Sequence, residues 1–185
     1  MLKNGGKDKD HNIMYVTGLS GSGKSTLANE LKNSKVDVIN LDLFLEENDS
    51  RNERNKNFVS YLTNHYPNFD EISRRQVKTG TKEFGKALDK FEACIDGFGR
   101  EQYSKKRNVV VEGVQLMDDT LYPNKSVLKD KPILTPNTSP LRSMIRGMKR
   151  DEIELELDDL KERVEWYRQS SKNLKKFKQE VGLRR

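Results

Sequence analysis

The chain has 185 residues, a length that suits one compact domain with a hydrophobic core. Charged residues make up 35% of it and hydrophobic residues 33%, a polar balance outside the range of disordered chains. The net charge of +6 favours anionic partners such as nucleotides, phosphorylated metabolites or nucleic acid. The single Cys94 excludes an internal disulfide, and no run of residues resembles a membrane span or a secretion segment. We therefore expect a cytoplasmic protein with no membrane partner.

The first part of the chain predicts a strand, a glycine-rich turn and a helix. Residues 1–11 are polar, and we expect them to form a flexible tail before a single domain of residues 12–185. Residues 13–17 are an apolar, β-prone run, and a strand is predicted over about residues 12–17. The next nine residues, 18–26, read GLSGSGKST and match the phosphate-binding pattern G-x-x-x-x-G-K-[ST]. A helix is predicted to follow over residues 27–32.

This arrangement directs several backbone N–H groups and the positive end of a helix at one point. Lys24 can then reach the β- and γ-phosphates of a nucleotide, and the Ser25 hydroxyl can ligate Mg²⁺. A flexible Gly/Ser linker is the alternative, but it needs neither the Lys-Ser pair nor the flanking strand and helix. The pattern predicts a nucleoside triphosphate site formed by Gly18, Ser20, Gly21, Ser22, Gly23, Lys24, Ser25 and Thr26.

Three further strands are predicted along the chain. Residues 36–41 predict a second strand, which ends at Asp42, and residues 132–134 predict a short one flanked by prolines. Residues 108–111 are continuously apolar, as expected for a central parallel strand that is covered on both faces. Alternating strands and helices predict an α/β fold, a three-layer α/β/α sandwich with a parallel sheet. Ligands of such sheets gather beyond the carboxyl ends of the strands.

Along the chain, helices are predicted before the third strand and after the fourth. In the insert of residues 46–106, one helix begins near Phe58 and a second covers residues 82–103. Ser139 is the expected N-cap of a helix that ends at Arg150, within a mobile lid of residues 139–151.

The C-terminal region, residues 152–185, carries apolar residues at helical spacing. It predicts one long helix or two, with the break expected at Ser170-Ser171. We expect its apolar stripe to pack on the sheet, and a contact between two copies in a homodimer is the alternative.

Two carboxylates follow predicted strands and are candidates for chemistry. Asp42 faces the γ-phosphate in this architecture, where it can orient an acceptor hydroxyl and take its proton. The alternative is that it only caps a helix. Glu112 can hold Mg²⁺ through a water molecule, contact the acceptor, or serve only as a polar strand end. The third strand lacks the Asp-Glu ending of hydrolytic motors, and no Asn-Lys-x-Asp is present to bind guanine. Both absences favour phosphoryl transfer over hydrolysis.

Three arginines repeat at four-residue intervals after the fourth strand, and all three would lie along one helix face: Arg142, Arg146 and Arg150. Guanidinium groups that close on the transferred phosphoryl group stabilise its charge and exclude water. A solvated basic face is the alternative reading. Arg74 and Arg75 in the insert are candidates for binding an acceptor phosphate. The alternative is that both belong to a solvated surface. Phe44 follows Asp42 and is a candidate contact to the acceptor.

Taken together, these segments resemble the uridine kinase-like branch of the P-loop kinases, which includes phosphoribulokinase and bacterial pantothenate kinase. Besides residues 18–26, the matching segments are Asp42-Leu43-Phe44, Val110-Val111-Glu112-Gly113, and residues 146–151, similar to the lid pattern Arg-Arg-Ile-x-Arg-Asp. The resemblance implies a P-loop NTPase fold of the nucleoside and nucleotide kinase type, and the use of ATP and Mg²⁺. It also implies that Asp42 is the base and that Arg146 and Arg150 are lid arginines. Gly147 departs from the pattern, because the family has a second arginine there.

Three hypotheses about function follow. The first is an ATP- and Mg²⁺-dependent kinase that phosphorylates a hydroxyl of a nucleoside, a nucleotide or a related small molecule. The second places the acceptor hydroxyl on a modified base or an end of DNA or RNA. The third is a nucleotide-dependent switch or motor whose output is a conformational change.

Overall fold

A computed structural model describes the chain over residues 12–41, 55–66, 82–117, 125–129, 131–150 and 157–183. For residues 82–91, 126, 127, 150 and 157–160 it describes the course of the backbone alone. None of the helices in these ranges is long and apolar enough to cross a membrane.

The centre of the fold is a four-stranded parallel sheet in the order β2-β3-β1-β4. Its strands are β1 (Ile13–Val16), β2 (Val36–Asn40), β3 (Asn108–Glu112) and β4 (Ile133–Leu134). The valine run of β3 lies between β2 and β1, which confirms the prediction of a central strand, because side chains on both faces of such a strand are buried. All four predicted strands are present, and the chain has an α/β fold.

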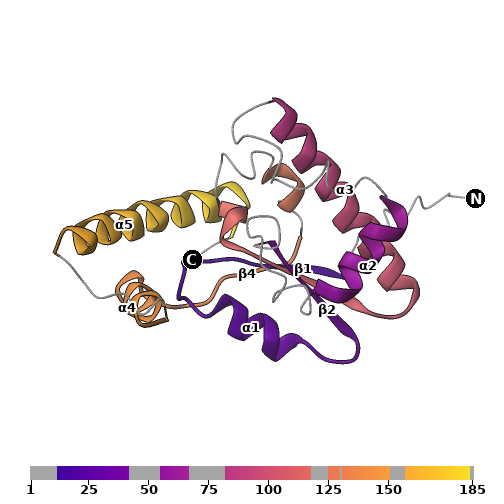
Figure 1. Cartoon of the computed structure of the whole chain (residues 1–185), viewed down its shortest axis with the longest axis horizontal. Coiled ribbons are helices and arrows are strands. Elements are labelled where there is room, and N and C mark those ends of the chain that lie inside the picture. Colours follow the sequence, from indigo (N-terminus) through magenta and orange to yellow (C-terminus); the bar gives the residue numbers. More distant parts are fainter. Residues whose placement is uncertain are drawn as a thin grey trace, which may run out of the picture.

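Helices cover both faces of the sheet, as Figure 1 shows. On one face, α1 (Lys24–Leu31) packs its buried Ala28 against Val16, Val38 and Val110. The larger core cluster lies on the other face, under α2 (Lys56–His65), α3 (Lys82–Ser104) and the end of α5 (Leu157–Glu180). Its fully buried aromatic side chains are Phe58, Phe98 and Phe177. Two short 3-10 helices, Val114–Met117 and Lys125–Leu128, lie between β3 and β4.

Two glycines inside α3 are explained by close packing. An added Cβ at Gly97 would overlap the Tyr61 hydroxyl of α2, and one at Gly99 would lie 2.8 Å from Cγ1 of Ile13 in β1. The helix therefore runs through both glycines, and each lets a neighbouring element approach closely.

The predicted break at Ser170-Ser171 is wrong, because α5 continues from Leu157 to Glu180. The Ser171 hydroxyl donates a hydrogen bond to the Tyr167 carbonyl one turn earlier, at 2.7 Å. A serine that bonds back to its own helix in this way is accommodated without ending the helix. The prediction for α4 (Pro140–Arg150) is confirmed, and the Arg142 N–H donates to the Ser139 hydroxyl at 3.3 Å, as expected of an N-cap.

Candidate functional site

The glycine-rich loop, residues 18–23, connects β1 to α1 at the carboxyl edge of the sheet. Gly21 and Gly23 have φ angles of 72° and 97°, a region that glycine enters at little cost. The Ser22 N–H donates to the Leu19 carbonyl at 3.1 Å and closes the turn. Gly23 is the N-cap of α1, and within the described parts of the chain no side chain caps this helix end. A helix end of this kind directs its first N–H groups at one point, where they suit an anion.

The side chains around this helix end suit a phosphate and its metal ion. The Lys24 ammonium donates to the Leu19 carbonyl at 2.9 Å, across the mouth of the loop, and the Ser25 and Thr26 side chains are exposed. The Ser22 hydroxyl is buried and has no hydrogen-bond partner among the residues that the structure describes. Burying a hydroxyl without a partner destabilises a protein, and a phosphate oxygen would supply an acceptor. These donors fit a Mg²⁺-bound polyphosphate, because Mg²⁺ prefers oxygen ligands and retains several waters.

Glu112 is buried at the carboxyl end of β3, and the residue is 3% exposed. In register it lies beside Val16 of β1 and Asn40 of β2, and the Asn40 amide donates to its carboxylate at 3.0 Å. The Thr17 hydroxyl donates to the Gly113 carbonyl at 2.8 Å, which ties this strand end to the entrance of the glycine-rich loop. The predicted juxtaposition of Glu112 with the loop is thus present in the fold.

Asn40 was not among the candidate residues. A signal was present, since a polar residue ends this strand at the ligand-binding edge of the sheet.

The helix α4 packs directly on the glycine-rich loop. An added Cβ at Gly21 would overlap the Ser143 carbonyl oxygen and lie 2.8 Å from the Gly147 nitrogen. Before the helix begins, the Thr138 hydroxyl donates to the Ser22 carbonyl at 2.9 Å. The segment after β4 therefore contacts the loop at two points, with α4 at Gly21 and with Thr138 at Ser22.

The arginines of α4 lie beside this contact. Arg142 and Arg146 are exposed, and neither is paired with a carboxylate in the described parts of the chain. Of Arg150 the structure describes only its position as the last residue of α4. The remaining predicted site residues lie outside the described residues: Asp42, Phe44, Arg74 and Arg75.

Tyr167 of α5 reaches the same place from a distant part of the sequence. Its side chain is 4% exposed, and its hydroxyl lies 3.2 Å from the Ser20 carbonyl of the loop and 3.2 Å from the Ser143 carbonyl of α4. The sequence indicated Tyr167 only as one member of the apolar stripe of the last helix. No pattern distinguishes a tyrosine that packs in a core from one whose hydroxyl joins two other elements.

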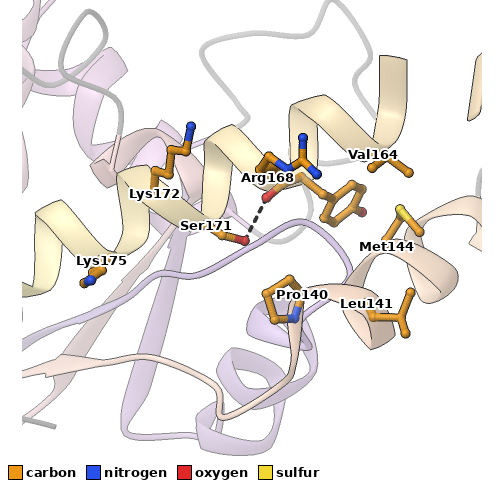
Figure 2. A pocket seen from close by; sticks show the side chains of 9 residues that line it. Pro140, Leu141, Met144, Val164, Arg168, Ser171, Lys172 and Lys175 are labelled. Carbon is orange, nitrogen blue, oxygen red and sulfur yellow. Dashed lines mark hydrogen bonds between the residues drawn. The ribbon is translucent and has the colours of Figure 1, made fainter. Parts of the chain in front are cut away.

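A groove of about 560 Å³ opens between α4 and α5. Figure 2 shows that Pro140, Leu141 and Met144 of α4 line one side and Val164 of α5 the other. Three cationic residues of α5 also line it, and they are Arg168, Lys172 and Lys175. The buried Tyr167 lies between this groove and the glycine-rich loop.

Among the described residues, no group of three or more histidine, cysteine, aspartate or glutamate side chains forms a metal cluster. In comparisons with known proteins, no protein-family model and no curated protein matches this chain. The geometry of the site and the sequence pattern therefore carry the functional argument.

Proposed function

We propose that this protein is a P-loop kinase that transfers the γ-phosphate of ATP, with Mg²⁺, to a hydroxyl of a nucleoside, a nucleotide or a related small molecule. The observation that carries the proposal is the glycine-rich loop, which enters an uncapped helix N-terminus directly at Lys24 and Ser25. The proposal includes the finer fold, a three-layer P-loop NTPase of the kinase type.

The donor half of the site holds the triphosphate. Backbone N–H groups at Gly21 and over residues 23–26, together with the positive end of α1, bind the phosphate oxygens, because a helix N-terminus favours negative charge. The Lys24 ammonium gives up its hydrogen bond to the Leu19 carbonyl and binds the β- and γ-phosphates instead. The Ser25 hydroxyl would ligate Mg²⁺ directly, and the buried Glu112 carboxylate would hold the same ion through a water molecule.

Transfer to a hydroxyl, as opposed to water, is supported by the residues around the donor site. Glu112 precedes a glycine, so the third strand lacks the Asp-Glu ending of hydrolytic motors. Asp42 lies two residues beyond Asn40, which pairs with Glu112 across the sheet edge. It can accept the proton of the acceptor hydroxyl. Arg142 and Arg146 stabilise the charge of the transferred phosphoryl group and displace water from it.

The test is transfer of label from γ-labelled ATP with Mg²⁺ to a panel of nucleosides, nucleotides, coenzyme precursors and modified DNA. We expect label on at least one acceptor. Lys24→Ala should abolish nearly all transfer, whereas Lys32→Ala, at the far end of the same helix, should leave it unchanged. Asp42→Asn should keep ATP affinity near normal and lower kcat by about two to four orders of magnitude, the usual range for loss of a general base.

Release of label only as inorganic phosphate, whatever the acceptor, would contradict the proposal and favour a nucleotide-dependent switch. Labelling of DNA or RNA alone would move the acceptor into a polymer. In that case, binding to the polymer should weaken steeply with added salt, because released counterions dominate such affinities.

A further inference from the structure

The Tyr167 hydroxyl is shared between two elements that meet at the glycine-rich loop. It has one proton to donate and two carbonyl acceptors, Ser20 and Ser143, each at 3.2 Å. Both distances are longer than is usual for O–H···O hydrogen bonds, as expected when one proton serves two acceptors. The hydroxyl therefore joins the loop to α4 from a third element, α5.

Two glycines make this three-way junction sterically possible. Gly21 admits the Ser143 carbonyl to the loop, and Gly147 admits the Tyr167 hydroxyl to α4, since an added Cβ at either position would overlap the oxygen concerned. Gly147 is the residue that departs from the lid pattern of the kinases that the sequence resembles. The side chain of an arginine at this position would overlap the Tyr167 hydroxyl and break the contact between α4 and Tyr167. The glycine at position 147 is therefore required by the tyrosine at position 167.

The rotation of α4 about its axis determines where its arginines lie. Residues three and four apart are neighbours on a helix surface, so Ser143 and Gly147 form one stripe that faces the loop. Arg146 follows Ser143 by three residues and is adjacent to that stripe, and Arg142 is one turn before Arg146. A small rotation or shift of α4 on the loop would move both guanidinium groups relative to a phosphate bound there.

We propose that Tyr167 is a positioning residue, which fixes α4 on the glycine-rich loop so that Arg146 reaches the terminal phosphate of a bound triphosphate. This inference rests on the proposed function, because it assumes that the loop binds the inner phosphates. It assigns a role to a residue of α5 that contributes no atom to the phosphate itself. The hydroxyl acts through the two carbonyls that it joins.

The experiment compares two inorganic anions, tripolyphosphate and pyrophosphate, each with Mg²⁺, by isothermal titration calorimetry on the full chain. The ratio of the two affinities reports the contact to the terminal phosphate and needs no knowledge of the acceptor or the base. Arg146→Ala should lower this ratio about tenfold, the scale of one hydrogen bond to a charged group. Tyr167→Phe removes only the hydroxyl and should lower the ratio about three- to tenfold. Because it acts through Arg146, adding it to Arg146→Ala should cause no further fall.

Tyr61→Phe is the matched control. It removes another buried hydroxyl, which is hydrogen-bonded to Tyr66 at the edge of α2, and it should leave the affinity ratio at the wild-type value. Thermal unfolding of both variants measures the structural cost of each hydroxyl separately from its effect on binding.

Two results would overturn the inference while leaving the proposed function intact. In one, Tyr167→Phe keeps the wild-type ratio. In the other, its effect adds in full to that of Arg146→Ala, which means that it does not act through the arginine. A wild-type protein that binds neither anion, or a Lys24→Ala variant that binds both normally, would overturn the proposed function itself and this inference with it.

Discussion

Single residues in this protein show how the same backbone conformation serves different purposes. Gly21 and Gly182 have almost the same φ angle, 72° and 74°. At Gly182 an added Cβ would meet nothing within 4 Å, whereas at Gly21 it would overlap the Ser143 carbonyl oxygen. The pair therefore separates the strain of a left-handed alanine from the loss of a close contact between two elements.

Gly182→Ala should lower the free energy of unfolding by about 1–2 kcal/mol, the cost of the left-handed conformation for a residue with a Cβ. Gly21→Ala should add about 1–3 kcal/mol to that cost, because overlapping atoms force α4 away from the loop. Only Gly21→Ala should weaken binding of Mg²⁺-tripolyphosphate. Urea unfolding and calorimetric titration of the two variants measure these effects, and equal losses for both would contradict the close contact.

At the scale of elements, one glycine and one hydroxyl meet where α4 packs against α5. The Tyr167 hydroxyl occupies the space that a Gly147 side chain would take, and the ring carbon Cζ behind it lies 3.6 Å from the added Cβ position. A contact of 3.6 Å is ordinary, so the oxygen alone excludes an alanine at position 147.

Gly147→Ala should destabilise the protein by about 1–3 kcal/mol through overpacking, even though alanine favours a helix over glycine by about 1 kcal/mol. In a Tyr167→Phe background the overlap is gone, so Gly147→Ala should become neutral or stabilising by up to about 1 kcal/mol. A double-mutant cycle in urea unfolding measures the coupling. Additive effects of the two substitutions would show that the hydroxyl and the glycine are independent.

Over the whole molecule, the core under α2 and α3 contains a cluster of groups that release protons with difficulty. A hydrogen bond with the Cys94 thiol, together with burial, raises the pKa of Tyr66 from 10.0 to about 12. Burial raises the pKa of Tyr61 and that of the Cys94 thiol in the same cluster. Each of these groups is uncharged in the folded protein at neutral pH.

The folded state therefore holds the Tyr66 proton more tightly than the unfolded state does. Its contribution to stability is fully present below pH 10, and it is lost as the pH rises from 10 towards about 12, where the folded protein also ionises. The urea midpoint should fall across this range, and Tyr66→Phe should reduce the fall. Tyr103→Phe, which changes a tyrosine that is 68% exposed, is the control and should reproduce the wild-type curve. An unchanged curve for Tyr66→Phe would contradict the assignment.

The sequence alone predicted those features that depend on residues close to one another along the chain. The strand, turn and helix around residues 18–26 follow from a local pattern, because glycines at fixed positions decide the backbone of the turn whatever packs on it. The apolar runs of β1 and β3 indicated strands of a parallel sheet for the same reason, and the sheet brings Glu112 to the loop as expected. The assignments of Asp42, Phe44, Arg74 and Arg75 remain predictions from the sequence.

Only the tertiary structure decided which distant segments meet at the loop. Tyr167 lies 147 residues from Ser20 in the chain, and their contact depends on the rotation and position of α5, which the helical spacing of apolar residues leaves undetermined. The same packing explains Gly147, which in the sequence was only a departure from a family pattern. Local residues thus determine the glycine-rich turn, while the packing of α4 and α5 determines where the arginines of α4 lie beside it, because side chains from separate helices meet only after the chain has folded.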